Sequence, residues 1–286
     1  MSFIEFKNVT KTYKNVVALN NINLKLEKGK IYGLLGRNGA GKTTLLNILT
    51  NKIFCNSGDV LLEGESVVEN DKAQGRIYCM VEQCYYPEGS KIKSLFEWSK
   101  AFYPKFDNNY ALELAHKFNL NINKKVKELS TGYSSIYKII ISLACNADII
   151  ILDEPVLGLD ANHRDLFYKE LINKYSKDMQ TIILSTHLVQ EAANIIEEVI
   201  IIDEGKVMLT DTVENLLSQG FTITGPAQQV DSFTKNLNTL GEDVLGGLKS
   251  VYVLENISKE SIPQGLELSK IDLQKLFVHL TNKDGE

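Results

Sequence analysis

The chain lacks long hydrophobic runs. None of its 286 residues falls in an apolar stretch that approaches the roughly 18 residues needed for a membrane-spanning helix. The longest aliphatic runs, such as 149–152 and 199–202, have the length of β-strands. The first residues carry charges where a signal peptide would have its apolar stretch. We therefore expect neither a signal peptide nor a spanning helix, and a role at a membrane would require a partner.

A basic excess and a cysteine framework are also missing. Lysine and arginine number 31 against 36 acidic residues, so the formal charge is −5 and there is no electrostatic reason to bind nucleic acid. The few cysteines form no C-x-x-C pair and have no metal-ligand spacing, which is typical of reduced thiols in a cytoplasmic protein. They are Cys55, Cys79, Cys84 and Cys145. The chain also has no internal repeat.

Buried aliphatic segments alternate with helical patterns over the first 220 residues. Buried strands are predicted at 31–35, 149–152, 181–185 and 199–203. Helices are predicted at 43–49, 94–120 with a break near Pro104, 131–146, 162–175 and 188–197. This alternation predicts an α/β domain with a largely parallel sheet. Two runs of alternating hydrophobicity, 3–10 and 16–27, predict further strands ahead of it.

The composition changes after about residue 210, where glycines punctuate shorter elements. Residues 249–255 read as a strand, and Ser269 and Asp272 have capping-box spacing before an apolar helix. We therefore predict a main domain over residues 1–220 and a small α/β accessory domain over residues 221–286.

A phosphate-binding loop is the first motif that carries chemistry. The eight residues that fit G-x-x-x-x-G-K-[ST] are Gly36, Arg37, Asn38, Gly39, Ala40, Gly41, Lys42 and Thr43. A buried strand precedes the loop and a helix follows it, so backbone N–H groups and a helix start would face an anion. Lys42 would reach the β- and γ-phosphates, the Thr43 hydroxyl would ligate Mg²⁺, and Thr44 would add a phosphate contact. The motif predicts ATP and Mg²⁺ as ligands.

Two carboxylates end a second buried strand. The aliphatic run 149–152 leads into Asp153 and Glu154. Asp153 would hold Mg²⁺, directly or through water, and Glu154 would activate the attacking water as general base. Acidic residues are common at strand ends, and it is the combination with the phosphate loop that favours a catalytic reading.

Over roughly residues 2–230 the chain resembles the ATP-binding-cassette (ABC) ATPases. Leu129-Ser130-Thr131-Gly132-Tyr133 matches the family's signature, usually LSGGQ, and Gly158-Leu159-Asp160 follows the acidic pair at D-loop spacing. His187 follows a strand at the place of the switch histidine. The resemblance implies a P-loop NTPase core, an antiparallel β subdomain and a helical subdomain at about 84–146.

The same resemblance implies roles for individual residues. Tyr13 would stack on adenine, and Ser130 with Gly132 would contact the γ-phosphate held by a second subunit. Asp160 would cross that dimer interface, and His187 would bind the γ-phosphate and the Glu154 region. The signature departs from the family at Thr131 and Tyr133, which stand where glycine and glutamine are usual.

Two alternatives remain open for residues 82–106, which precede the signature. Either Gln83 or Glu82 would approach Mg²⁺ as the Q-loop residue, with Gln83 the expected residue type. The segment after it is rich in aromatic residues, which would either line a groove for a membrane subunit or pack a small helical core. These residues are Tyr85, Tyr86, Phe96, Trp98, Phe102, Tyr103 and Phe106.

The resemblance implies a transport ATPase that dimerises, with itself or a related cassette, around two ATP. It would power a separate transmembrane permease from the cytoplasmic face of the cell membrane. The LSTGY signature, residues 101–107 and the tail at 273–281 resemble bacterial exporters of peptides, antibiotics or lipid-like compounds. One alternative is a soluble ABC-type ATPase acting on ribosomes or DNA, although the chain has a single cassette and no long insertion. Another is a non-catalytic regulator, which would lack Glu154 or His187.

Overall fold

A six-stranded sheet forms the centre of the protein, as seen in a computed structural model that describes residues 2–83, 86–258 and 261–281. Its order is β10-β9-β3-β8-β7-β6. The strands are β3 (Ile31–Leu35), β6 (Ile77–Met80), β7 (Ile149–Asp153), β8 (Thr181–Ser185), β9 (Glu198–Asp203) and β10 (Lys206–Thr212). All neighbours are parallel except the edge pair β9 and β10. The predicted α/β fold with a largely parallel sheet is confirmed.

Both faces of this sheet are buried, which explains the uninterrupted aliphatic strands. In β7, Ile149 and Ile151 belong to one apolar cluster, whereas Ile150 and Leu152 belong to another on the opposite face. Successive side chains of a strand point to opposite faces, so a strand covered on both sides is apolar at every position.

One face of the central sheet packs on helix α1 (Lys42–Leu49) and on an antiparallel sheet. That sheet has the order β2-β1-β4-β5. Its strands are β1 (Ile4–Tyr13), β2 (Val16–Leu26), β4 (Ser57–Leu62) and β5 (Glu65–Ser66). A short helix, α2 (Asp71–Gln74), leads into β6. The predicted strands at 3–10 and 16–27 are therefore confirmed.

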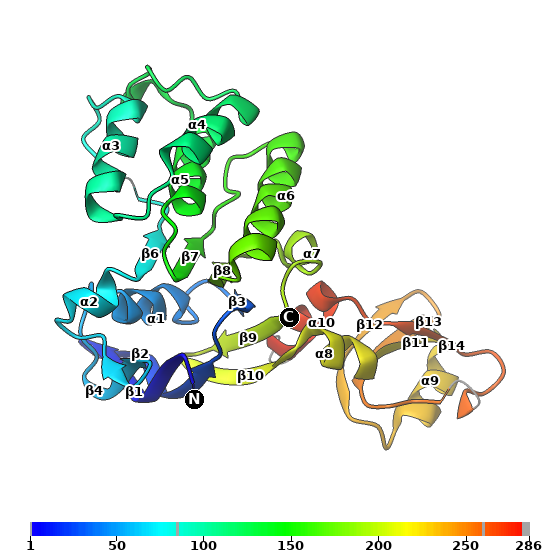
Figure 1. Ribbon diagram of the computed structural model, residues 1–286. Coiled ribbons are helices and arrows are strands. Elements are labelled where there is room, and N and C mark those ends of the chain that lie inside the picture. The colour runs from blue at the N-terminus through cyan, green and yellow to red at the C-terminus, as the bar shows by residue number, and fades with distance from the viewer. Residues whose placement is uncertain (1, 84–85, 259–260, 282–286) are drawn as a thin grey trace.

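Helices cover the other face. They are α3 (Ile92–Phe102), α4 (Asn108–Lys117), α5 (Thr131–Ala144) and α6 (Ala161–Asp178), with a 3₁₀ turn at Val126–Glu128. Helices α3, α4 and α5 gather into one group beside the sheet (Figure 1). The predicted break near Pro104 falls between α3 and α4. In the part of the chain that the structure describes, no helix combines the length and apolarity required to span a bilayer.

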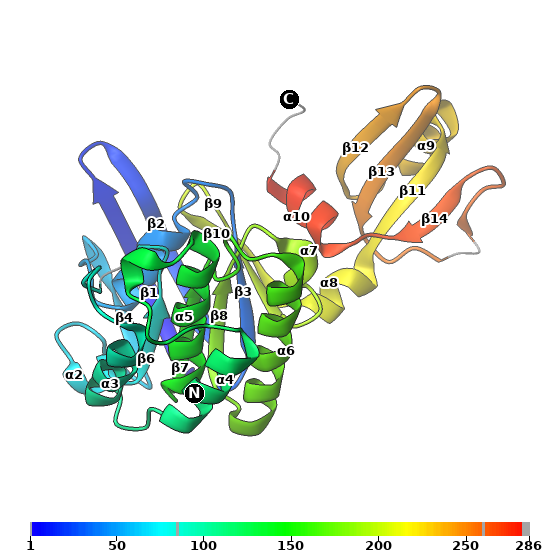
Figure 2. The same ribbon diagram turned by 90° about the horizontal axis from the view of Figure 1, so that it is seen from above.

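The last quarter of the chain forms a second, smaller unit that projects to one side (Figure 2). Helix α8 (Val213–Gln219) leads into it. We call the elements that follow the C-terminal unit: β11 (Gly220–Pro226), α9 (Ala227–Thr234), β12 (Thr239–Leu245), β13 (Leu248–Leu254), β14 (Glu267–Lys270) and α10 (Leu273–Thr281). Its antiparallel sheet has the order β12-β13-β11-β14 and its own small apolar core.

Two local predictions were wrong. The helix expected at 188–197 is a single turn, α7 (Val189–Ala192). The backbone N–H groups of Ile195 and Ile196 both bond to the carbonyl of Ala192, after which Glu197 joins Ile31 and the chain enters β9. The capping box before α10 is also absent, because Ser269 is paired inside β14 and Asp272 alone accepts the Lys275 N–H at 2.7 Å.

Candidate nucleotide site

The loop between β3 and α1 adopts a conformation that depends on glycine. Gly39 and Gly41 have φ angles of +83° and +110°, which residues with a side chain rarely adopt. A Cβ atom at Gly36 would lie 2.5 Å from the carbonyl oxygen of Ile202, and one at Gly41 would lie 2.7 Å from that of Ala18. The chain is thus packed tightly beneath the loop and cannot accept side chains there.

Lys42 lies against this loop. Its Nζ donates to the carbonyl oxygens of Gly36 at 2.6 Å and Arg37 at 3.2 Å. Burial lowers the pKa of Lys42, and the charges of Glu154 and Asp153 oppose that shift. A cation held among backbone groups at a helix start is suited to an anion with several charges, as a triphosphate has. The loop therefore fits the predicted phosphate ligand.

The carboxylates lie at the carboxyl end of β7, which β8 separates from β3. Glu154 has a φ of +47°, and its N–H donates to the carbonyl of Ser185 at 2.8 Å. Nδ1 of His187 lies 2.8 Å from Glu154 Oε2. Burial raises the pKa of Glu154, against the opposing effect of His187. The two residues assigned to catalysis therefore make direct contact, although 33 positions separate them.

Thr186 was missed by the sequence analysis. This residue is buried, its hydroxyl lies 3.5 Å from Glu154 Oε2, and it accepts the Leu188 N–H at 3.1 Å. The available signal was its position directly after the predicted strand 181–185, because parallel strands bring their carboxyl ends to the same edge of a sheet.

The signature lies at the start of α5. Ser130 is exposed and caps this helix, accepting the Tyr133 N–H at 3.3 Å. A Cβ atom at Gly132 would lie 2.5 Å from the carbonyl oxygen of Gly158, so the signature and the D-loop pack closely. The small residue at this position is needed for that approach, whatever Thr131 and Tyr133 contribute.

Asp160 begins α6. Its carboxylate accepts the His163 N–H and pairs with His163 Nδ1, both at 2.9 Å. The backbone hydrogen bond from His163 holds the pKa of Asp160 below its usual value. His163, which matched no motif, therefore supports the D-loop carboxylate.

Comparison with known proteins identifies the family. A family profile described as "ABC transporter" matches residues 19–157. The chain is 34% identical over 189 residues to the ABC transporter ATP-binding protein YtrB of Bacillus subtilis, a match that covers 66% of this chain and 64% of YtrB. It is 33% identical over 221 residues to the lantibiotic transport ATP-binding protein SrtF of Streptococcus pyogenes, covering 74% of this chain and 93% of SrtF. The chain belongs to the ABC transporter ATP-binding family.

Solved cassettes share the fold. A dimeric structure of the ATP-binding cassette MJ0796 bound to ADP and Pi has a TM-score of 0.65 and 26% identity, covering 73% of this chain and 98% of that one. Relatives of this cassette also include proteins named for sugar import. Membership of the family is therefore clear, whereas the relatives are named for different substrates.

The two Q-loop candidates lie directly after β6 in this cassette. Glu82 and Gln83 are both exposed, but the charge of Glu82 contributes to raising the pKa of Asp153, after burial as the main cause. Gln83 instead borders a neighbouring hollow.

Tyr13, the predicted adenine contact, is exposed at the end of β1, with Lys11 Nζ 5.1 Å from the centre of its ring.

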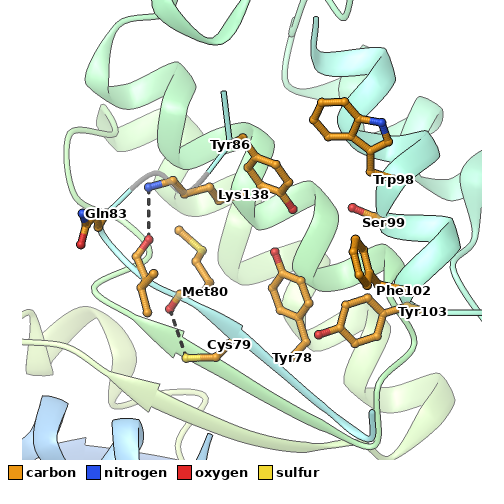
Figure 3. A pocket seen from close by; sticks show the side chains of 11 residues that line it. Tyr78, Cys79, Met80, Gln83, Tyr86, Trp98, Ser99, Phe102, Tyr103 and Lys138 are labelled. Atoms are coloured by element: carbon orange, nitrogen blue, oxygen red, sulfur yellow. Dashed lines mark hydrogen bonds between the residues drawn. The ribbon is translucent and has the colours of Figure 1, made fainter. Parts of the chain in front are cut away.

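The hollow beside the Q-loop segment measures about 340 Å³ and is mainly aromatic. Figure 3 shows Tyr78 and Tyr86 facing Trp98, Phe102 and Tyr103 across it. Phe102 is 79% exposed and Trp98 is 40% exposed, whereas Phe96 and Phe106 are buried. Some aromatic residues of this segment are therefore core and others are open surface, and Tyr85 lies outside the described residues.

The partly buried charge of Asp153 gives a prediction on stability. Burial raises the pKa of this carboxyl, so its contribution to stability is complete below the unfolded pKa and is lost as pH rises through the raised value. At pH 7 the ionised group destabilises the nucleotide-free chain. Asp153→Asn should therefore raise the Tm at pH 7 by about 2–4 °C, with a smaller gain near pH 4. Thermal unfolding measures this, with exposed Asp59→Asn as control, and a lower Tm at pH 7 would contradict it.

Proposed function

We propose that this chain is an ATP-hydrolysing subunit that dimerises around two ATP and powers a separate membrane subunit. The observation that carries the proposal is the contact between His187 and Glu154 at the strand end beside the phosphate loop. A regulator without catalysis would not need this pair. The dimeric solved cassette of similar fold supports the assembly.

The proposed binding residues surround one edge of the sheet. Lys42 and the N–H groups of Gly36–Thr44 would bind the phosphates, and exposed Tyr13 would stack on adenine. Thr43 and Asp153, with Glu82 or Gln83, would hold Mg²⁺. When bound, this ion neutralises charge on the β- and γ-phosphates. The pKa of the partly buried Asp153 carboxyl stays raised although Lys42 lowers it, which fits a site that binds a further cation.

Glu154 has the properties of a general base. Its raised pKa makes the carboxylate a better proton acceptor than an exposed glutamate. His187 fixes one oxygen of the carboxylate through Nδ1, which leaves the other available to orient a water molecule. A proton taken from that water would reside on Glu154 as the water attacks the γ-phosphorus and the bond to the β–γ bridging oxygen breaks, with ADP as the leaving group.

The dimer would bring the signature of one cassette to the ATP of the other. Ser130, Gly132 and Asp160 lie at the exposed starts of α5 and α6, where N–H groups favour an anion. Binding of ATP would therefore close the dimer, and hydrolysis would release it.

Ser130→Arg should block ATP-driven dimerisation while monomers still bind nucleotide. The bulky cation would obstruct the approach of a second copy, whereas the phosphate loop is untouched. Gel filtration of the chain with ATP and Mg²⁺ measures the dimer, and a labelled nucleotide measures binding. The control is Ser176→Arg at an exposed position of α6. If Ser130→Arg dimerises and hydrolyses ATP normally, the LSTGY segment is only a helix cap.

The partner would be a transmembrane permease that docks on the aromatic hollow, holding the cassette at the cytoplasmic face of the membrane. Exposed aromatic side chains of this kind are frequent at protein interfaces. Export of a peptide, antibiotic or lipid-like compound is the finer proposal, supported by the likeness to the lantibiotic transport protein. A ribosomal or DNA function is not favoured. We further propose the domain division 1–220 and 221–286, with a helical subdomain near 84–146.

Co-purification tests the partner. The tagged chain should retain an integral membrane protein when its source membranes are solubilised in detergent, and Phe102→Glu should reduce its recovery by about 10-fold or more. The matched control is Leu245→Glu, which places the same charge at an equally exposed apolar position on the C-terminal unit. Equal recovery in both variants would move the docking site elsewhere, and ribosomes or DNA in place of a membrane protein would refute the transport assignment.

A further inference from the structure

Helix α7 directly follows the segment that carries His187, and it contacts helix α10. This single turn begins two residues after His187, and it lies beside α10 of the C-terminal unit in both views (Figures 1 and 2). The side chain of His187 is 61% exposed and touches Glu154 with its ring. Because little packs around the ring itself, its position depends on the backbone that α7 holds.

An ion pair connects helix α6 to α7. Arg164 Nη1 lies 3.0 Å from Glu191 Oε1, which joins the two helices. One turn further along α6, the hydroxyl of Tyr168 is buried and has no hydrogen-bond partner among the described residues. Burial raises the pKa of Tyr168, and the charges of Glu191 and Glu154 add to this effect. The Arg164–Glu191 pair therefore ties α6 to the short helix that follows His187.

Helix α10 packs on α7 from the C-terminal unit. Leu273 and Leu276 are buried, and they belong to the large apolar cluster that also contains Val189 and Ala192 of α7. The core of the C-terminal unit itself is a different cluster, which includes Val230. Helix α10 thus packs on α7 at the main cluster, which also includes Tyr252 of β13, whereas Val230 and its neighbours form a separate core.

We infer that α10 and the Arg164–Glu191 pair act together as a clamp on α7 that positions His187 against Glu154. The C-terminal unit thereby supports ATP hydrolysis from outside the nucleotide site, and movement of this unit would change the rate of hydrolysis. Arg164, Glu191 and Leu276 are positioning residues, because they would act on His187 through α7. This inference rests on the proposed catalytic roles of Glu154 and His187.

The clamp predicts a selective loss of turnover. A catalytic group displaced by about 1 Å can lose up to about 100-fold in rate, whereas an exposed ion pair adds little to stability. Glu191→Gln in the full chain should therefore lower kcat for ATP hydrolysis by about 3- to 10-fold, with ATP affinity and Tm unchanged. Reversing both charges, Arg164→Glu with Glu191→Arg, should restore most of the rate.

The chain offers a matched control in a second Arg–Glu pair. Arg76 and Glu63 lie 2.8 Å apart with side-chain exposures of 26% and 47%, against 28% and 36% for Arg164 and Glu191. This pair lies away from α7, at the turn before β5 and the start of β6. Glu63→Gln should leave kcat unchanged. An equal fall in both variants, or no fall in Glu191→Gln, would overturn the clamp.

The α10 side is tested with two cavity-forming changes. Leu276→Ala and Val230→Ala each remove a fully buried side chain from a helix of the C-terminal unit, but only Leu276 shares a cluster with α7. We expect kcat to fall in Leu276→Ala and to persist in Val230→Ala at temperatures where both remain folded by circular dichroism. Equal effects on kcat would assign the loss to the stability of the unit and refute the clamp.

Failure of the inference can be told apart from failure of the proposed function. If the wild-type chain hydrolyses no ATP, alone or in detergent-solubilised membranes, the catalytic proposal fails. If the wild type is active and Glu191→Gln and Leu276→Ala match it, only the clamp fails.

Discussion

Lys42→Ala should abolish ATP binding. The Nζ of Lys42 is held by two loop carbonyls and lies in the field of Glu154 and Asp153, so it is the cation that would offset a triphosphate beside two carboxylates. Without it, phosphate oxygens would meet those carboxylates with no intervening charge. The loss of a buried, hydrogen-bonded charge pair should weaken ATP binding by about 100-fold or more.

Titration with a labelled ATP analogue measures this change. Lys72→Ala, at an exposed position of α2, is the control for loss of a positive charge. Circular dichroism should show the same fold in both variants, because Lys42 makes its polar contacts with the loop rather than with the core. Near-normal affinity in Lys42→Ala would refute the assignment of the phosphate loop.

The central fold followed from the sequence because its strands are buried on both faces. Uniformly aliphatic runs such as Ile149–Leu152 have few alternatives, and their spacing with helices indicates a parallel sheet. The helix predicted at 188–197 was wrong because the apolar residues of this segment fit more than one local structure. Ile195 and Ile196 fit a helical pattern, but they are the turn that leads into β9, and only the pairing of Glu197 with Ile31 defines where the helix ends.

The site residues that belong to local sequence motifs could be predicted. The contacts between segments that are distant in the sequence could not. Lys42, Asp153 and Glu154 were assigned from ordered motifs alone, and the structure brings them to one edge of the sheet. The packing of Gly132 on Gly158 depends on how two helix starts meet in space. The periodicity of a sequence does not reveal which distant segments meet in space. The contact of α10 with α7 could not be predicted for the same reason.

Glutamate and glutamine can be exchanged at position 154 with little change in shape. The backbone there has a φ of +47°, which both residues tolerate equally, so the turn should persist. The amide can still hydrogen-bond to His187 Nδ1 and Thr186. What it loses is the ability to accept a proton from water.

Glu154→Gln should therefore reduce ATP hydrolysis by about 10²- to 10⁴-fold while nucleotide binding continues. Asp153, Thr43 and Lys42 are unchanged, so ATP should still join the phosphate loop of one copy to Ser130 of the other. Since hydrolysis is the step that reopens the dimer, the variant should accumulate as a closed, ATP-loaded dimer. Gel filtration with ATP and Mg²⁺, combined with a phosphate-release assay, measures both effects.

Glu63→Gln serves as the control, because it makes the same chemical change at an exposed position outside the site. If the isolated chain dimerises poorly, the same pair of variants is compared in complex with the membrane subunit. A wild-type rate in Glu154→Gln would show that another group accepts the proton. His187 would then be the group to test next, because its ring lies 2.8 Å from the Glu154 carboxylate.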